Sequence, residues 1–141
     1  VKHRPSIRVV LTATAGGRPG LSFKTWEEVM SFSRKIKNSE LRDAVYSAPS
    51  GIHGTGLFAR RRMKKGEYIG TYHGPDAKRN GTYVLWVFDK GDEENAVGRS
   101  GRNLLRYLNH ADPGNAEFDG FDLYARSSIR VDEEITFNYE G

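Results

Sequence analysis

Two polar segments of the chain carry residue types that could do chemistry. The first runs from Asn109 to Asn115 and places His110 beside side-chain amides in a turn that contains a proline and a glycine. Such turns present polar groups instead of burying them in a helix or strand. The second is the run 134–139, a strand-like stretch that ends in Tyr139. Together they predict a polar pocket for a small ligand with a phenol beside it.

Each of these residues also has an ordinary structural interpretation. A tyrosine at the end of a strand is more often part of the core or of a sheet edge. The two asparagines can simply stabilise the turn, since their side chains hydrogen-bond nearby backbone. His110 can be satisfied in the same way. A functional assignment therefore depends on the joint pattern along the rest of the chain.

Composition restricts the class of protein. The chain has 141 residues, a length that suits one domain with its own core. It contains no cysteine, which excludes disulfides and thiolate zinc sites within it and suits an intracellular protein. No apolar run approaches membrane-spanning length, and the basic start lacks the apolar stretch of a signal peptide. We expect no membrane association, and a location in the nucleus if the source is eukaryotic or in the cytoplasm if it is bacterial.

The elements that must position the polar segments are mostly short strands. Residues 103–108 are expected to form a short helical turn, and the polar stretch 90–101 an exposed insert. Thr25 and Glu28 have the spacing of a capping box and predict a helix over about 25–37. The expected strands are 6–12, 56–60, 68–72, 83–88, 116–118, 121–125 and 134–139. This pattern predicts a β-dominated α+β fold, with an N-terminal extension over 1–45 and a main domain over 46–141.

Gly54 and Gly56, followed by Ala59, satisfy a dinucleotide-binding pattern, and Asp76 lies where a ribose-binding acid would be. The context disagrees, because residues 47–51 make a poor parallel strand and the basic run after the motif gives no amphipathic helix. We therefore disfavour a dinucleotide site. What remains is the use of two glycines to let a ligand or another strand approach the backbone closely.

The main basic cluster, Arg60-Arg61-Arg62 with Lys64 and Lys65, is short and interrupted by Met63. The net charge of +4 permits contact with nucleic acid without demanding it. A solvated strand edge is the favoured interpretation of the cluster, and a phosphate track is the alternative.

Five pieces of the chain together form a recognisable order. They are Gly54-x-Gly56-Leu57-Phe58-Ala59, Gly66-Glu67-Tyr68-Ile69, Tyr72-His73-Gly74, Asn103 with Arg106-Tyr107-Leu108-Asn109-His110 and Asn115, and finally Asp132-Glu133-Glu134-Ile135-Thr136-Phe137-Asn138-Tyr139. Their order and spacing resemble the SET domain of protein-lysine methyltransferases over about residues 46–141. The resemblance implies small β-sheets around a pseudoknot, in which the C-terminal segment threads through a loop formed by the preceding stretch.

The resemblance also implies a cofactor, S-adenosyl-L-methionine, and the residues that hold it. Gly54 and Gly56 would approach the cofactor through backbone contacts. Asn109 would hold its methionine part, and the backbone of His110 would meet its adenine. No metal is implied.

On the opposite face the resemblance implies a narrow channel for the substrate lysine. Tyr72 and Tyr139 would line it, with Tyr83 as a further wall residue. Tyr139 matches the family's catalytic tyrosine, and Tyr72 is assigned a catalytic role beside it.

The chemistry of methyl transfer suits those roles. Transfer from a sulfonium to an amine is an in-line displacement, so alignment and exclusion of water supply most of the rate. The amine must first lose its proton, and a lysine with a pKa of about 10.4 resists this in water. An apolar channel next to the sulfonium disfavours the ammonium form by desolvation and like charge. Tyrosine rings form such walls and carry one hydroxyl that can orient the nitrogen.

The chain departs from the family in four respects. Ala111 and Asp112 stand where Ser and Cys are usual, and Arg102 is an apparent one-residue insertion. The cysteine-rich zinc module that closes the lysine channel in many histone methyltransferases has no counterpart in a chain without cysteine. The aromatic position that helps set the number of methyl groups falls on Gly141, so further chain, a partner chain or a second copy is a candidate to complete the channel.

The expected substrate is a lysine in a basic protein tail, a histone or, less favoured, a ribosomal protein. The acidic stretch 89–94 could attract such a tail, although a solvated loop is an equal interpretation. Two alternatives stay open. One is a non-catalytic SET-like module that binds a peptide or nucleic acid in the same groove, and the other is a basic β-domain on nucleic acid, so direct nucleic-acid binding is a secondary expectation.

Overall fold

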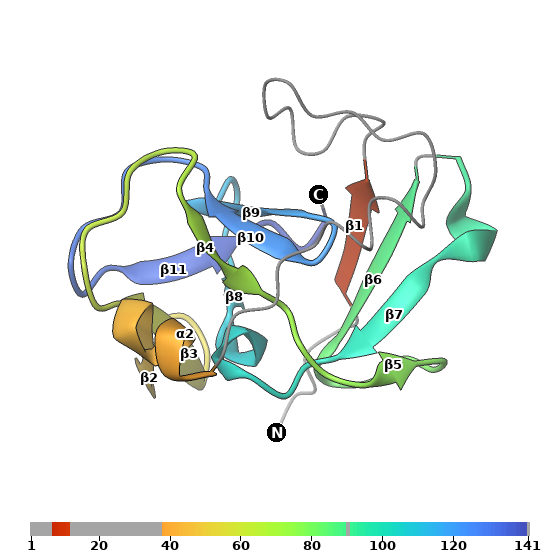
Figure 1. Cartoon of the computed structure of the whole chain (residues 1–141), viewed down its shortest axis with the longest axis horizontal. Helices are drawn as coiled ribbons and strands as arrows, with labels where there is room; N and C mark the ends of the chain where they lie inside the picture. The colour runs from red at the N-terminus through yellow and green to blue at the C-terminus, as the bar shows by residue number, and fades with distance from the viewer. Residues whose placement is uncertain (1–6, 12–37, 90, 141) are drawn as a thin grey trace.

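A computed structural model describes residues 7–11, 38–89 and 91–140, and short strands dominate it (Figure 1). In chain order the elements are β1 (Ile7–Leu11), α2 (Asn38–Ala44), β2 (Val45–Pro49), β3 (Thr55–Ala59), β4 (Tyr68–Thr71), β5 (Asp76–Ala77), β6 (Val84–Asp89), the 3-10 turn η2 (Glu93–Asn95), β7 (Val97–Ser100), the 3-10 turn η3 (Leu104–Tyr107), β8 (Asn109–His110), β9 (Ala116–Asp119), β10 (Asp122–Ala125) and β11 (Glu134–Phe137). The β-dominated α+β class is therefore confirmed. Within the described ranges no helix is long and apolar enough to cross a membrane.

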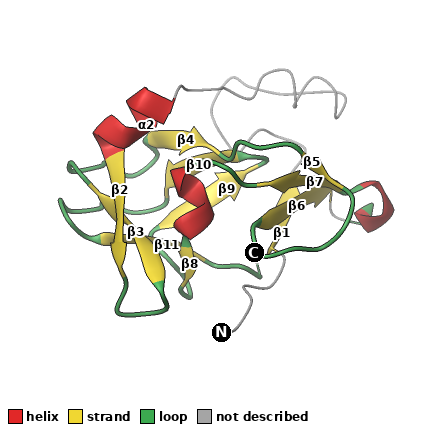
Figure 2. Ribbon diagram, turned by 90° about the horizontal axis from the view of Figure 1, so that it is seen from below, coloured by secondary structure: helices red, strands yellow, loops and turns green. Residues whose placement is uncertain are grey.

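The strands form three sheets, which confirms the small β-sheets that the resemblance to the SET domain implies. Their strand orders are β1-β6-β7-β5, β4-β10-β9 and β2-β3-β11-β8. Figure 1 shows the first sheet on one side of the molecule and the other two on the opposite side, and Figure 2 shows the same separation from below. The polar segments singled out in the sequence belong to the third sheet, through β8 and β11.

Most strand predictions are confirmed to within one or two residues, and the helical turn expected over 103–108 is η3. The strand expected over 6–12 is β1, which pairs in parallel with β6 from Ile7 opposite Leu85 to Leu11 opposite Asp89. The strand expected over 134–139 ends earlier, at Phe137, so that Tyr139 lies two residues beyond β11. The helix expected over 25–37 lies outside the described residues.

The prediction of an exposed insert over 90–101 is wrong for its second half. Val97–Ser100 forms β7, which pairs with β6 so that Gly98 lies opposite Trp86. A Cβ atom at Gly98 would lie 2.6 Å from Cζ3 of Trp86. The absence of a side chain at Gly98 therefore lets an aromatic ring lie across the strand. Residues 91–95 are exposed, as expected.

The sequence also failed to predict α2, β2 and β5. The sequence disfavours a parallel strand over residues 47–51, and the first three of these residues belong to β2, which pairs with β3 in antiparallel register from Val45 opposite Ala59 to Pro49 opposite Thr55. An antiparallel strand can alternate buried and exposed positions and can end in a proline at its edge, so it needs no continuous apolar run.

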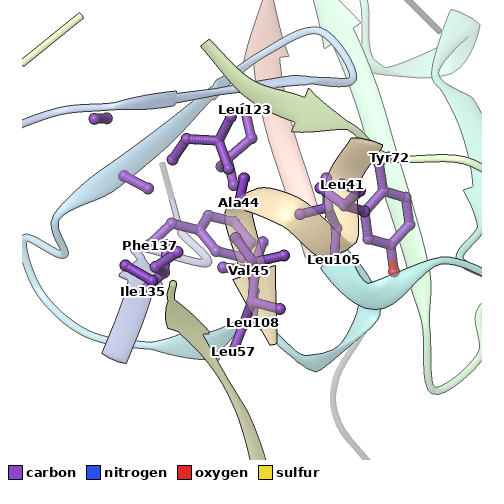
Figure 3. Close-up of a cluster of buried hydrophobic side chains, with 14 of the residues drawn as sticks. Leu41, Ala44, Val45, Leu57, Tyr72, Leu105, Leu108, Leu123, Ile135 and Phe137 are labelled. Atoms are coloured by element: carbon purple, nitrogen blue, oxygen red, sulfur yellow. The ribbon is translucent and has the colours of Figure 1, made fainter. Parts of the chain in front are cut away.

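The core joins buried side chains from Leu41 to Phe137 (Figure 3). Leu41 and Ala44 of α2 belong to it, and Phe137 of β11 is 3% exposed. The largest side chains with almost no exposure are Phe121, Leu41, Leu57, Met63, Leu85, Leu105, Leu108, Leu123, Ile129 and Ile135. Burying an apolar side chain of this size contributes roughly 1.5–3 kcal/mol each.

The C-terminal strand β11 is held by both ends of the loop 109–115. At the start of the loop, Asn109 lies opposite Thr136 in a parallel ladder. At its end, the backbone N–H of Asn115 donates to the carbonyl oxygen of Thr136 at 3.1 Å, and Gly114 bridges to Phe137. Gly114 has a φ of 78°, and a Cβ there would lie 2.7 Å from the Cα of Phe137, so only glycine fits. This is the interlocking of loop and C-terminal segment that the pseudoknot requires.

Candidate cofactor and substrate site

The side-chain amide of Asn109 is buried and fixed in orientation. Its nitrogen donates to the carbonyl oxygen of His53 at 2.9 Å, to Oε2 of Glu134 at 3.0 Å and to Oγ of Ser50 at 3.1 Å. Asn109 itself is 2% exposed. Because the nitrogen faces these oxygens, the carbonyl oxygen of the amide is turned away from the loop 50–54.

Ser50 and Glu134 complete this arrangement. The hydroxyl of Ser50 donates to the carboxylate of Glu134, with its oxygen 2.9 and 2.8 Å from the two carboxylate oxygens. The same hydroxyl accepts hydrogen bonds from the backbone N–H of Ile52 at 2.9 Å and of His53 at 3.3 Å. The network therefore ties the loop between β2 and β3 to β8 and β11. We call Ser50, Asn109 and Glu134 the amide clasp.

The two glycines of the early motif lie beside the amide clasp, for different physical reasons. Gly54 has a φ of 46° and is exposed, and no atom lies within 4 Å of a Cβ built on it. Gly56 is buried, and a Cβ there would lie 2.5 Å from Oε2 of Glu134. Gly54 thus provides open backbone in a left-handed conformation. Gly56 provides the space in which the carboxylate of the clasp lies.

His110 uses its ring to hold the C-terminal segment. Its Nδ1 accepts a hydrogen bond from the backbone N–H of Tyr139 at 3.0 Å, and the two rings meet edge to face with centroids 5.2 Å apart. The side chain of Asn138 is also held, since its Nδ2 donates to Oδ1 of Asp112 at 3.4 Å. The histidine next to the clasp therefore positions the tyrosine that follows β11.

The phenol of Tyr139 has a fixed direction. Its hydroxyl donates to the carbonyl oxygen of Leu108 at 2.6 Å, and its ring lies 5.0 Å from that of Phe137. Tyr139 is half-buried. The residue is thus anchored at its backbone by His110 and at its hydroxyl by the residue preceding Asn109.

Tyr72 and Tyr83, the other two predicted channel residues, are joined to each other. Tyr72 is 2% exposed, and its hydroxyl donates to the backbone carbonyl oxygen of Tyr83 at 2.5 Å. The backbone N–H of Gly101 donates to the same carbonyl at 2.8 Å. Tyr83 is half-buried and its ring meets Tyr107 edge to face at 6.3 Å. The structure therefore places the phenol of Tyr72 against backbone and leaves Tyr83 closer to the surface.

A row of aromatic rings links Tyr72 to Tyr139. The ring of Tyr72 lies 5.9 Å from Phe118, Phe118 lies 5.0 Å from Phe137, and Phe137 lies 5.0 Å from Tyr139. The first two contacts are edge to face, the arrangement that aromatic pairs favour. The predicted pair of tyrosines is thus brought into one aromatic row through two phenylalanines.

Arg99 binds the backbone of Tyr72, the residue at one end of this row. Its guanidinium lies 3.9 Å above the ring of Phe121 and donates to the backbone carbonyl oxygen of Tyr72 at 2.8 Å. Burial lowers the pKa of Arg99, and the carboxylates of Asp76 and Asp122 oppose this effect. The arginine stays charged, because an arginine pKa begins far above neutral pH.

Sequence reasoning missed Ser50, Phe118 and Arg99, and treated Glu134 only as part of the closing strand. Ser50 carried one usable signal, since a serine at the start of a glycine-rich turn often caps the following N–H groups. Phe118 lay in a predicted strand, but nothing in the sequence indicated which ring it would meet. Among the described residues no group of three or more histidine or acidic side chains has the arrangement of a metal site.

Comparison with known proteins places this geometry in a family. A family model for the SET domain matches residues 54–140. Chaetomium thermophilum polycomb repressive complex 2 in complex with H3K27me3 and H3K27M is 27% identical, with a TM-score of 0.54, over 70% of this chain and 14% of that chain. The autoinhibited form of that complex bound to S-adenosylmethionine is 26% identical, with a TM-score of 0.50, over 68% of this chain and 15% of that chain.

A putative histone methyltransferase of Plasmodium falciparum has the same fold at 20% identity, with a TM-score of 0.50, over 68% of this chain and 92% of that chain. The chain spans about a seventh of the length of the polycomb chains it matches.

Proposed function

The chain belongs to the SET domain family, and from this we propose that it transfers a methyl group from S-adenosyl-L-methionine to the side-chain amine of a protein lysine. One observation carries the proposal. The residue that fixes Tyr139, His110, directly follows Asn109 of the amide clasp, and a hydrogen bond of 3.0 Å joins the ring of His110 to the backbone of Tyr139. The proposed cofactor site and the proposed catalytic tyrosine are therefore held by adjacent residues.

The residues near the amide clasp suit the cofactor's methionine end. The amide nitrogen of Asn109 is engaged by Ser50, His53 and Glu134, so its carbonyl oxygen is oriented away from them and can accept from the cofactor's ammonium group. Gly54 adds exposed backbone next to the clasp, and the backbone of His110 is assigned to the adenine. When bound, the cofactor supplies an electrophilic methyl group on a sulfonium.

The residues of the proposed lysine channel act by alignment and exclusion of water. The hydroxyl of Tyr139 is anchored on Leu108, which keeps its ring in one orientation as a wall. Tyr72 lies buried at the end of the aromatic row that is opposite Tyr139, and the half-buried Tyr83 lies beside Tyr72. A lysine amine in such an apolar site has a lowered pKa, because desolvation disfavours the ammonium form. The neutral amine is the form that attacks the methyl group.

A histone or similar basic tail is the proposed substrate, with a basic ribosomal protein as a less favoured class. The similar polycomb structure in complex with H3K27me3 and H3K27M supports the choice. The exposed acidic residues Asp92, Glu93 and Glu94 around η2 would attract a tail of positive charge. We also propose that the catalytic domain is the part from about residue 46 onward and that the protein acts inside the cell.

The test is methyl transfer from labelled S-adenosylmethionine to basic proteins, with the modified residue located by mass spectrometry. Tyr139→Phe is expected to lower kcat about a hundredfold, since one hydroxyl that orients the amine is removed. Asn109→Ala is expected to weaken cofactor binding measured by calorimetry. Tyr46→Phe is the matched control, because it removes a tyrosine hydroxyl that bonds Asp132 at 2.8 Å on the exposed side of β2. Full activity of both site variants would overturn the assigned roles.

The alternative function is a non-catalytic module that binds a peptide in the same place. It is favoured by the hydroxyl of Tyr72, which is directed at the backbone of Tyr83, and by Ala111 and Asp112 where the family usually has Ser and Cys. Calorimetry with S-adenosylmethionine separates the two functions. A folded protein that binds histone peptides but no cofactor would support the module.

A further inference from the structure

A second polar region lies at the far end of the molecule from β5, where two loops run side by side (Figure 1). One loop joins β3 to β4 and the other joins β10 to β11. Their residues 60–66 and 126–131 are separated by 60 positions or more in the chain. We call the exposed surface of these two segments the basic ledge.

Backbone hydrogen bonds align the two loops in a fixed register. Met63 and Ile129 exchange two bonds, from Met63 N to Ile129 O and from Ile129 N to Met63 O, each of 2.9 Å. Further along, the N–H of Gly66 donates to the carbonyl oxygen of Ala125 at 2.7 Å. The side chains of Met63 and Ile129 are fully buried. The ledge is therefore a fixed part of the fold, anchored by two apolar side chains that point inward.

Most of the other residues in the two segments are exposed cations. The two segments contain no acidic and no aromatic residue, and seven exposed cations: Arg60, Arg61, Arg62, Lys64, Lys65, Arg126 and Arg130. Two of them are paired with nearby carboxylates, Arg61 with Glu67 and Arg130 with Glu133. The guanidinium of Arg60 lies 5.1 Å over the ring of Tyr46. The other ledge cations keep the electrostatic potential of the ledge positive after these two pairs are counted.

The ledge holds half of the lysines and arginines in the part of the chain that the structure describes. Residues 7–11, 38–89 and 91–140 contain 14 Lys and Arg and 16 Asp and Glu, so that outside the seven ledge residues seven cations face 16 acids. Within these described ranges, positive charge is thus concentrated on the ledge. Clustered charge of one sign attracts a polyanion from a distance comparable to the Debye length, about 8 Å at physiological salt.

We propose that the basic ledge binds the phosphate backbone of double-stranded nucleic acid without reading its sequence. An array of cations along two aligned loops matches a polyanion that presents phosphates at regular intervals along its length. The hydroxyls of Ser127 and Ser128, both exposed, add donors of the kind that contact phosphate oxygens. Because the ledge has no aromatic side chain, it lacks the stacking platform that single strands require. If the chain methylates proteins as proposed above, such contacts would hold it near substrate proteins that are themselves bound to nucleic acid.

The ledge is less suited to a membrane surface. Its one large exposed apolar side chain is Val131, 53% exposed. Stable attachment to a bilayer requires apolar insertion or a lipid anchor in addition to charge. Vesicle binding is therefore an outcome of the test and not part of the proposal.

The test measures binding of a labelled 20-base-pair DNA duplex to the full chain by fluorescence anisotropy, over a series of salt concentrations. The variant Lys64→Gln/Lys65→Gln removes two ledge cations and leaves the buried anchors in place. The matched control is Lys78→Gln/Arg79→Gln, which removes two adjacent exposed cations next to β5, at the other end of the molecule. Circular dichroism of both variants verifies that the fold is kept.

The ledge variant is expected to weaken duplex binding severalfold at low salt and to flatten the slope of log K against log salt by about 1.8, at about 0.9 per lost phosphate contact. The control is expected to keep the slope of the unmodified chain. Equal losses in both variants would assign the binding to overall charge and overturn the proposal. Preference for a single strand, for polyglutamate or for phosphatidylserine vesicles over the duplex would overturn it as well.

Discussion

The amide clasp and the basic ledge are two polar regions of this molecule that are built in opposite ways. In the clasp, Asn109 is 2% exposed and its amide nitrogen is surrounded by oxygens at 2.9–3.1 Å. In the ledge, lysines such as Lys64 and Lys65 are exposed on a backbone held by buried apolar anchors. A buried network gives a group one orientation, which a reaction needs. Exposed cations attract a polyanion over a distance. They do not need to be held in one orientation to do so, and this suffices to dock a polyanion.

The largest loss of stability is expected from a substitution in the amide clasp, at Glu134. The substitution Glu134→Ala removes the acceptor of the Ser50 hydroxyl and one of the acceptors of the Asn109 amide, which keeps the carbonyl oxygen of His53. We expect a loss of about 2–4 kcal/mol in the free energy of unfolding, since a hydroxyl left without its acceptor costs about 1–3 kcal/mol and a lost hydrogen bond about 1 kcal/mol more. Lys65→Ala in the ledge is the control and is expected to change stability by less than about 0.5 kcal/mol. Denaturant unfolding of both variants measures the contrast, and equal effects would remove the distinction between the two regions.

A smaller effect is expected from Gly56→Ala. The added methyl group would lie 2.5 Å from Oε2 of Glu134, so the carboxylate must move away from Asn109. We expect a loss of about 1–3 kcal/mol, the usual cost of overpacking, together with weaker cofactor binding. The double variant Gly56→Ala/Glu134→Ala is expected to cost less than the sum of the two single changes, because the clashing group is gone. Additive losses in thermal unfolding would show that Gly56 acts through something other than the carboxylate.

The smallest effect concerns the border of the ledge, at Glu67. Burial acts to raise the pKa of this carboxyl, but the hydrogen bonds from Arg61 and from the backbone N–H of Lys64 outweigh it and lower the pKa. A carboxyl with a lower pKa in the folded state stabilises the fold above its unfolded pKa of about 4.3, and this contribution is lost as pH falls through the folded value.

Glu67→Gln should therefore cost under about 1 kcal/mol at pH 7, as for a partly exposed pair. The difference from the unmodified chain should shrink as the pH is lowered to 3 in denaturant titrations. A difference that persists unchanged at pH 3 would contradict the assignment.

Local patterns in the sequence were enough for much of the fold. Alternating apolar residues between turn signals placed β3, β4, β9 and β10 to within two residues, because alternation and turn chemistry act over short distances along the chain. They failed at β7, because the polar composition of residues 90–101 predicts an exposed insert, whereas Gly98 leaves the space that the ring of Trp86 occupies. They also failed for β2, whose pairing with β3 supplies the order that its own composition does not.

The candidate site could also be predicted only in part from the sequence. The order of the five motif pieces in the chain, which include Gly54, Asn109 and Tyr139, was sufficient to indicate the family that the SET domain match then showed. The partners of Asn109 could not be predicted, because Ser50 and Glu134 lie 59 and 25 positions away and neither stands out by type. The same holds for the aromatic row, since a phenylalanine in a strand does not indicate which ring it will meet.

The sequence by itself determined the residue types, their order and the turns, and therefore the family and the candidate ligands. Only the tertiary structure decided which way the amide of Asn109 faces, that Gly56 makes room for a carboxylate, and that Arg126 and Arg130 join the basic run of the other loop. The physical reason is that helix, strand and turn preferences are local properties of a few residues. Hydrogen bonds and fields between distant segments exist only after the core has brought those segments together.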